Sequence, residues 1–509
     1  MTLTLMIAIP AVAAFFSALS PLPKGSKILA LLASLAVSVL SIPLLTGFDL
    51  SNGGFQFKED FPLLPTLGVH YSLGLDGLSL WFVLLTALVT PLVILGSFSG
   101  IQKNVRGYFA CLLLLESAML GTLAARDLFL FYLFWELMLI PVFFLIGVWG
   151  GPERVKATIK FVLFTLFGSL LMLVALLYLT HEAHSFDYEV LMDHPIPEDV
   201  QFWCFLAFAL AFLIKVPLFP LHGWLADAYA EAPAGATVML SALMVKLGAY
   251  GFLRFCPTLF PTAAKAFAPW LMALALAGVL HGALMATIQT DFKRLAAYSS
   301  LSHMGMAFLG ILTFTPAGLQ AGVFLMVAHG IYMAGLFLLL GFLEERRGSR
   351  LMTDFGGAAQ TAPWLAFFFL WLMAAAVGLP GLAGFVGEIL VLVPLFKTHV
   401  FFAALALVGF VLSAWYFFNL YGRLFFGASR AAEKTSIPDL RFREILALFP
   451  LAVLAIWLGL SPNQILRPME KSLQMNIVER LKPPPEMTDF AARQRFQQEL
   501  QRERQGKRP

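Results

Sequence analysis

Titratable side chains lie inside long apolar stretches of this sequence, where they could hold and pass protons. A charge at the depth of a bilayer costs about 2.5–3.5 kcal/mol or more, so each such residue needs a reason. Six of them combine carboxylate, amine and imidazole groups, and each lies on a different apolar stretch: Glu136, Lys215, Lys246, His303, His329 and Glu388. We predict that five of them, Lys215, Lys246, His303, His329 and Glu388, form a polar row, bridged by water, that carries protons across the membrane, and that Glu136 acts together with Lys215.

Glu136 and Lys215 have the chemistry of a proton switch. Burial favours the neutral form of an amine, and a nearby carboxylate favours the charged form. A pair that closes and opens would therefore hold a proton on Lys215 and then release it. Pro217 should break the helix directly after Lys215, free backbone carbonyls and admit water beside the amine. The alternative is an ion pair that only fixes helix packing, and it is disfavoured because buried pairs are poor stabilisers on balance.

Other buried polar residues admit plainer explanations. Taken singly, His303 and His329 could equally be neutral, hydrogen-bonded histidines of the protein interior. For Glu116 we favour a protonated or hydrogen-bonded carboxyl without a role in transport. Asp76, in the stretch GLDGLSL, is expected to cap the helix that follows it.

The composition is that of a polytopic membrane protein. The chain has 509 residues, of which 60% are hydrophobic and only 13% are charged, whereas soluble domains contain about 25% charged residues. The three cysteines show no CxxC spacing, and neither a GxGxxG nor a Walker motif is present. We therefore expect no metal and no cofactor on this chain, and no binding of nucleic acid.

The elements that must position the polar row are membrane helices. A membrane helix needs about 20 apolar residues. We predict an all-α fold with about fourteen transmembrane helices, at residues 2–20, 28–46, 77–100, 107–124, 127–149, 157–180, 200–220, 236–256, 267–289, 295–314, 318–343, 362–394, 399–422 and 444–460.

The seventh and twelfth predicted spans are interrupted, by VPLFPLHG and GLPGLAGFVGE. They lie five spans apart, so two five-helix units related in this way would have opposite orientations, as inverted repeats of transporters do. Pro and Gly are also simply commoner in membrane helices, but two matching breaks fit that explanation less well. The predicted parts are three N-terminal helices, two five-helix repeats, a fourteenth helix and a polar tail, at residues 1–106, 107–260, 261–425, 426–464 and 465–509.

The basic residues between spans predict an orientation. Lys and Arg are concentrated in short cytoplasmic loops of membrane proteins. In this chain most of them follow odd-numbered spans, and only five follow even-numbered ones: Lys58, Arg126, Arg254, Lys265 and Lys397. We therefore predict both termini on the periplasmic or outer side. The polar tail is expected to contain a linker at residues 483–485 followed by a solvated helix.

Several long stretches resemble one known family. They are FLFYLFWELMLIPVFFLIGVWG, FLIKVPLFPLHGWLADAYAEAPAGATVMLSALMVKLGAYGFLRF, QTDFKRLAAYSSLSHMGM, MVAHG and GLPGLAGFVGEIL. They are similar to the antiporter-like subunits of respiratory complex I, which share ancestry with subunits of cation/proton antiporters and membrane-bound hydrogenases. The resemblance covers roughly predicted spans 3 to 13. It implies that Glu136 and Lys215 form the modulating pair, that Lys246 is the central lysine, and that His303 and His329 connect it onward.

Glu388 discriminates within that family. The L-type and N-type subunits and the antiporter relatives usually carry Lys at this place, whereas the M-type (chain 4) subunits carry Glu. The resemblance therefore implies an M-type subunit of a bacterial inner membrane, surrounded by lipid and by other membrane subunits, among them the L- and N-types. It implies proton translocation driven by electron transfer from NADH to quinone, with NADH, FMN, iron–sulfur clusters and quinone in partner subunits and no redox centre on this chain.

Other functions remain open at this point. A subunit of a multisubunit cation/proton antiporter would have the same internal chemistry, and only Glu388 argues against it. A ferredoxin-linked or hydrogenase-linked relative is also compatible, because the electron input is not encoded in this chain. A purely structural membrane scaffold would predict that Lys246→Ala leaves pumping intact.

Overall fold

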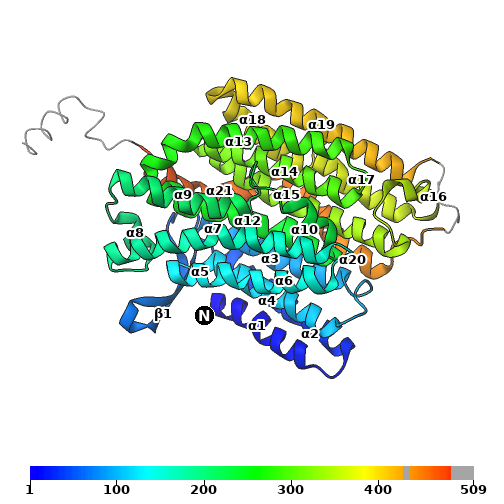
Figure 1. Ribbon diagram of the computed structural model, residues 1–509, viewed down its shortest axis with the longest axis horizontal. Coiled ribbons are helices and arrows are strands. Elements are labelled where there is room, and N and C mark those ends of the chain that lie inside the picture. The colour runs from blue at the N-terminus through cyan, green and yellow to red at the C-terminus, as the bar shows by residue number, and fades with distance from the viewer. Residues whose placement is uncertain (428–435, 483–509) are drawn as a thin grey trace, which may run out of the picture.

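Long apolar helices make up most of the molecule. The computed structural model describes residues 1–427 and 436–482, and its helices run side by side along the long axis in Figure 1. Within the described residues, twelve are long and apolar enough to span a membrane. They are α1 (Thr2–Leu19), α2 (Pro23–Thr46), α3 (Gly77–Gly96), α4 (Val105–Ala124), α5–α6 (Leu128–Trp149), α7 (Arg154–Ala183), α11–α12 (Ala234–Leu259), α13 (Pro261–Ile288), α14 (Phe292–Leu312), α15 (Pro316–Arg347), α19 (Val400–Phe425) and α20 (Phe442–Leu460).

Interrupted helices occupy the other two predicted spans. In the seventh, α9 (Glu198–Lys215) ends before Pro217, and α10 (Leu225–Glu231) follows a stretch of turns. The indole of Trp224 donates to the carbonyl oxygen of Ile214 at 2.9 Å, so the break satisfies a backbone group that it has freed.

In the twelfth span, α17 (Pro363–Val377) and α18 (Ala383–Thr398) are separated by a turn. Gly378 ends α17 with a φ of 77°, a conformation that glycine adopts without strain. Both breaks therefore lie where the sequence predicts them. The total of fourteen spans, the inverted repeats and the part boundaries stay predictions.

A β-hairpin departs from the predicted all-α fold. Strands β1 (Gln56–Leu64) and β2 (Val69–Leu75) pair antiparallel between α2 and α3, and a short turn helix, Pro65–Leu67, joins them. The prediction missed the hairpin because it searched for stretches of span length, which short strands do not reach. The hairpin fixes the start of α1: the carboxylate of Glu59 accepts from the backbone N–H groups of Leu3 at 2.9 Å and Thr4 at 3.1 Å.

Residues 463–478, where the predicted polar tail begins, form a helical element. Helix α21 (Asn463–Leu473) packs against α3 and α15, and the π-helical segment Gln474–Val478 packs against α12. Apolar residues at a spacing of four are buried on one face: Ile465, Met469, Leu473 and Ile477. Because this helix is amphipathic and short, hydropathy alone hides it. The predicted linker and solvated helix from residue 483 onward lie outside the described residues.

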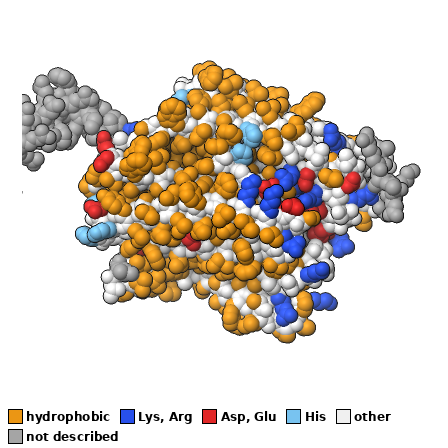
Figure 2. All heavy atoms as spheres, in the orientation of Figure 1, with side chains coloured by type: hydrophobic (Ala, Val, Ile, Leu, Met, Phe, Trp, Pro, Cys, Tyr) orange, Lys and Arg blue, Asp and Glu red, His pale blue; other side chains and the backbone are white. Residues whose placement is uncertain are grey.

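The basic residues gather toward one end of the molecule. Figure 2 shows Lys and Arg side chains toward the right-hand end of a face otherwise covered by hydrophobic ones. Hydrogen bonds tie odd-span loops together there: Lys27 donates to the Phe98 carbonyl at 2.6 Å, and Arg443 donates to the Ser99 hydroxyl at 2.8 Å.

The sequence predicts Arg254 in a loop after an even-numbered span. This prediction is wrong, because Arg254 is buried within α12. It forms a bidentate ion pair with Asp76, at 2.6 and 2.7 Å. Asp76 also accepts from the backbone N–H of Ser79 at 3.0 Å, which confirms the predicted cap of α3.

The remaining short elements lie outside the long helices. They are α8 (Tyr188–Asp193), the 3₁₀ turn Met352–Asp354 and α16 (Ala358–Thr361). Figure 1 places α8 toward the end that holds β1 and the N-terminus, and α16 at the opposite end.

Candidate proton-transfer site

Lys215 is the last residue of α9 and is 2% exposed. Its Nζ lies 3.4 Å from the centroid of the Trp135 ring. In the described part of the chain Nζ has no hydrogen-bond partner, and no ion pair joins it to Glu136. The amine therefore rests on the face of an aromatic ring, which attracts a cation.

Glu136 lies next to Lys215 without closing on it. It lies near the end of α5 (Leu128–Leu137), two residues before Met138. Met138 is not part of a regular helix and separates α5 from α6 (Leu139–Trp149). The Ser169 hydroxyl and the Lys215 amine are among the polar groups close enough to act on its carboxyl. One carboxylate oxygen, Oε1, is buried and has no partner among the described residues. The predicted pair is thus adjacent but open.

Lys246 is positioned by an irregular helix. Between α11 (Ala234–Val238) and α12 (Val245–Leu259), residues Met239–Met244 form a π-helical segment. Its wider turn leaves the Ser241 carbonyl free to accept from Lys246 Nζ at 2.5 Å. The same Nζ lies 2.7 Å from His329 Nδ1 on α15. When the amine is protonated it can only donate, so His329 then carries its own hydrogen on Nε2.

The row continues from His329 to His303 and Glu388. The rings of His329 and His303 have centroids 5.8 Å apart. His303 Nδ1 lies 2.9 Å from the Tyr332 hydroxyl and 3.6 Å from Glu388 Oε1. Glu388 Oε2 and Nε2 of both histidines have no partner among the described residues. Basic, neutral and acidic groups therefore lie next to one another in one enclosed region.

Close helix packing places Glu388 in this row. On α18, the residue before it is Gly387, where an added Cβ would meet the Leu325 side chain at 2.9 Å. Gly384, one turn earlier, would meet the carbonyl oxygen of Ala375 at 1.8 Å. Small residues after the break thus let α18 approach α15 and α17 and bring Glu388 inside.

The row lies in the most enclosed part of the molecule. In the most apolar 18-residue stretch of α11–α12 and of α15 all residues are buried, and in that of α14 94% are. These three spans carry Lys246, His329 and His303. Of the six predicted residues, four form this contiguous cluster, and Lys215 and Glu136 lie beside each other. Gly248, two residues after Lys246, would meet the backbone nitrogen of Val216 at 2.8 Å, so α12 lies directly against the end of α9.

The sequence reasoning missed two side chains of the site, Tyr332 and Trp135. Tyr332 lies three residues after His329, a spacing that shares a helix face and could have identified it. Trp135 adjoins Glu136, but nothing in its type distinguishes it from the other aromatic residues of that stretch. Glu116 is fully buried in α4, and neither of its carboxylate oxygens has a partner in the described residues.

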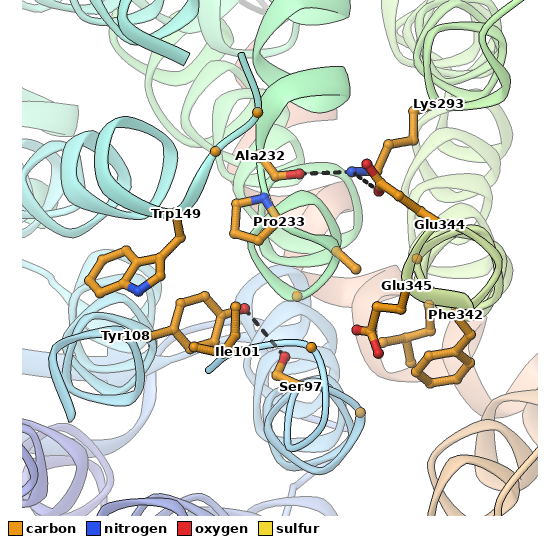
Figure 3. A pocket seen from close by; sticks show the side chains of 18 of the residues that line it. Ser97, Ile101, Tyr108, Trp149, Ala232, Pro233, Lys293, Phe342, Glu344 and Glu345 are labelled. Carbon is orange, nitrogen blue, oxygen red and sulfur yellow. Dashed lines mark hydrogen bonds and ion pairs between the residues drawn. The ribbon is translucent and has the colours of Figure 1, made fainter. Parts of the chain in front are cut away.

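A cavity with both apolar and charged residues in its lining lies where α3, α6 and α15 end, and Figure 3 shows it from close by. It has a volume of about 220 Å³, and Ala234 and Gly235, the first residues of α11, line it. Lys293 projects into it and forms an ion pair with Glu344 at 2.8 Å. Since α11 continues into the segment that holds Lys246, one helix borders the cavity and the row. Residues 1–427 and 436–482 contain no cluster of His, Cys, Asp and Glu that could hold a metal ion.

The chain is similar to known membrane subunits. A family model described as NADH:quinone oxidoreductase/Mrp antiporter, TM matches residues 125–413. The NADH-quinone oxidoreductase subunit M of Rickettsia prowazekii (strain Madrid E) is 38% identical over 462 residues, which cover 90% of this chain and 94% of that protein.

Solved structures share the fold. A chain in the respiratory complex I from Thermus thermophilus with bound NADH has a TM-score of 0.86 and 37% identity, and the match covers 95% of this chain and 100% of that one. A chain of the Mrp complex from Dietzia sp. DQ12-45-1b has a TM-score of 0.79 at 23% identity, over 93% of this chain and 52% of that one, and shows the fold alone. The chain therefore belongs to the NADH:quinone oxidoreductase/Mrp antiporter family of membrane subunits, and the relatives that it matches over most of their length include NADH-quinone oxidoreductase subunit M proteins.

Proposed function

We propose that this chain is the proton-translocating subunit M of a NADH:quinone oxidoreductase. The observation that carries the proposal is the contiguous cluster of Lys246, His329, His303 and Glu388 in the most enclosed helices. Titratable groups are expensive at this depth, and in membrane proteins they mark proton relays. A scaffold that only held neighbouring subunits together would have no use for an amine, two imidazoles and a carboxylate in one row.

We propose a direction of transfer along this cluster. A proton reaches Lys246 from the basic end, through the cavity that α11 borders, and passes by way of His329 and His303 to Glu388. Glu136 and Lys215 act as the switch. When the pair is closed, the carboxylate holds the proton on the amine, and when it is open, the buried amine releases it toward the row.

The free energy for this movement comes from other subunits. Electron transfer from NADH to quinone supplies it, and FMN, the iron–sulfur clusters and quinone belong to partners of this chain. L-type and N-type antiporter-like subunits are its neighbours in a bacterial inner membrane, and both termini face the outer side. The names of the relatives support the assignment to this complex. The gathering of Lys and Arg side chains toward one end of the molecule (Figure 2) supports the orientation.

Lys246→Ala tests the transport role. In vesicles that contain the complete complex, we expect NADH-driven proton uptake per assembled complex to fall at least about tenfold, since even 1.4 kcal/mol on the barrier has that effect. The matched control is Lys397→Ala, which removes an exposed lysine at the end of α18 and should leave uptake unchanged. Uptake at the wild-type rate in Lys246→Ala would reassign the chain to a scaffold.

Co-purification tests the complex. In mild detergent the chain should bring with it water-soluble subunits that oxidise NADH. Recovery of only other membrane subunits, together with sodium/proton exchange that needs no electron donor, would instead indicate an antiporter.

A further inference from the structure

Glu231 lies in the wall of the cavity of Figure 3, and the proposed function does not yet use it. It is the last residue of α10, shortly before α11 begins, and it is 4% exposed. Its carboxylate forms an ion pair with Arg350 through Oε1 at 3.0 Å. Through Oε2 it accepts from the backbone N–H of Glu153 at 2.9 Å, and its own carbonyl oxygen accepts from the N–H of Gly151 at 2.9 Å.

These contacts join the span of the switch to the span of the row. Gly151 and Glu153 belong to the loop that directly follows α6, and α5–α6 is the span that holds Glu136. Glu231 directly precedes α11, and α11–α12 is the span that holds Lys246. A continuous chain of helix and hydrogen bonds therefore leads from one span to the other.

Glycines let the loop come this close to Glu231. A Cβ added at Gly151 would lie 2.6 Å from Glu231 Oε2, and one added at Gly150 would lie 3.0 Å from the Glu231 carbonyl oxygen. Any larger residue at position 151 would have to push the loop and the carboxylate apart.

Arg350 ties Glu231 to the helices of the two histidines. It follows α15, which carries His329, and its Nε lies 3.4 Å from the carboxylate of Asp291. Asp291 is the N-cap of α14, which carries His303. The carboxylate of Glu231 thus joins the loop of the switch span to the ends of the helices that form the row.

Capping of α10 alone does not require this carboxylate. Cations already satisfy carbonyl groups that the end of the helix leaves free: Lys293 donates to Ala232 at 2.9 Å (Figure 3), and Arg350 donates to Ala230. The bond from Glu231 to the loop after α6 is an additional contact between spans.

Resting on the proposed function, we propose that Glu231 is a positioning residue that couples the switch to the proton-carrying row. A movement of α5–α6, as the Glu136–Lys215 pair opens or closes, reaches α11 through the loop and Glu231. It then reaches the π-helical segment that positions Lys246. Coupling between sites is carried by such chains of hydrogen bonds and rigid helices. Without the link the pair would still open and close, but the position of Lys246 would no longer depend on it.

Glu231→Gln tests the inference, because it keeps the size of the side chain and removes its charge. The single amide oxygen can accept from the Glu153 N–H only if the NH₂ group faces Arg350, which is itself only a donor, so one link is lost. In vesicles with the complete complex, NADH oxidation and proton uptake are measured per assembled complex. We expect the protons taken up per NADH oxidised to fall at least about twofold, since a hydrogen bond to a charged group can shift an equilibrium about tenfold or more. Glu231→Asp keeps the charge and should retain part of the coupling.

The matched control is Glu444→Gln. Glu444 is also a buried carboxylate paired with an arginine from the end of α15, Arg346. It lies on α20, which carries none of the six predicted residues. Its replacement is expected to lower the amount of assembled complex and to leave the protons per NADH unchanged.

Gly151→Ala tests the link from the side of the loop. We expect it to lower the protons per NADH as Glu231→Gln does, and the double variant should be little worse than either single one, because both break the same link. Gly147→Ala, on α6, is the control. Its added Cβ would make an ordinary contact, 3.5 Å from the Thr158 hydroxyl, and the ratio should stay at the wild-type value.

A wild-type ratio of protons to NADH in Glu231→Gln would overturn the coupling. A loss of oxidation and uptake in equal proportion would also overturn it, because a purely structural role predicts that result. Normal uptake in Lys246→Ala would overturn the proposed function. If Lys246→Ala loses uptake while Glu231→Gln keeps the wild-type ratio, this inference alone fails.

Discussion

The Lys215 amine lies 3.4 Å from the ring centroid of Trp135. It forms no ion pair with the carboxylate of Glu136, the residue that follows Trp135 in the sequence. A desolvated cation–π contact contributes about 2 kcal/mol or more, enough to compete with an ion pair that must also be desolvated. The indole ring therefore gives the amine a second resting place within reach of the first. The structure holds the Glu136–Lys215 pair in its open arrangement.

Both members of this pair should be required for pumping. Glu136→Gln and Lys215→Ala are each expected to lower NADH-driven proton uptake at least about tenfold. Because one switch needs both groups, the double variant should pump little worse than either single one, a non-additive result. Glu182→Gln, at an exposed position near the end of α7, is the control. Near-normal uptake in both single variants would remove the switch.

Glu388 should depend on its ability to take up a proton. Glu388→Gln keeps the size of the side chain but cannot be protonated at the amide, so we expect impaired proton uptake. Glu388→Asp keeps the acid on a shorter side chain, which lengthens the approach to His303, and should retain part of the rate. The measurement is again uptake per assembled complex, and an unaffected Gln variant would place Glu388 off the exit path.

The ion pair of Asp76 and Arg254 should support assembly, not pumping. Removing one member of a buried pair leaves an unpaired charge and costs about 3–5 kcal/mol. We expect Arg254→Leu to lower the amount and the thermal stability of the assembled complex. Adding Asp76→Asn removes the second charge and keeps a helix cap, so the double variant should recover stability. A double variant less stable than Arg254→Leu would show that the charges are not the cause.

The anchor of α1 should weaken in acid. Burial by itself would raise the pKa of Glu59, but hydrogen bonds from Thr4 and from the N-terminus outweigh it and hold that pKa below its ordinary value of 4.5. A carboxyl whose pKa is lowered by folding stabilises the fold above its unfolded pKa, and this stabilisation is lost as the pH falls through the folded pKa. Hydrogen-exchange protection of the Leu3 and Thr4 amides should therefore drop below pH 4.5.

Glu59→Gln is the control for this pH dependence. The amide keeps an acceptor oxygen but has no proton to gain in this range. Protection of the two amides should therefore be weaker than in the wild type at neutral pH and should not change further in acid. A wild-type protein whose protection, corrected for the intrinsic exchange rate, stays constant down to pH 3 would contradict the role of Glu59.

Hydropathy and residue type predicted where the helices lie and which residues are candidates for the site. They did not predict which side chains of different helices contact one another. The spans, the two breaks and the cap at Asp76 follow from local composition, which is what a helix requires. Contacts across helices do not: the 2.7 Å approach of Lys246 to His329 depends on how α12 and α15 pack. The amphipathic α21 and the strands of the hairpin were hidden because neither is long or uniformly apolar.

The π-helical segment Met239–Met244 has a consequence for the spacing of the chain. In an α-helix each residue advances the side-chain direction by about 100°, and a π turn takes in one residue more. The insertion thus rotates everything beyond it, so that Gly235 can border the cavity while Lys246 points at His329. Deleting a single residue here would turn the Lys246 side chain to another face of the helix, although every functional residue would still be present. The number of residues between positions 235 and 246 therefore determines the direction of the Lys246 side chain, and proton transfer should depend on it as it depends on the lysine.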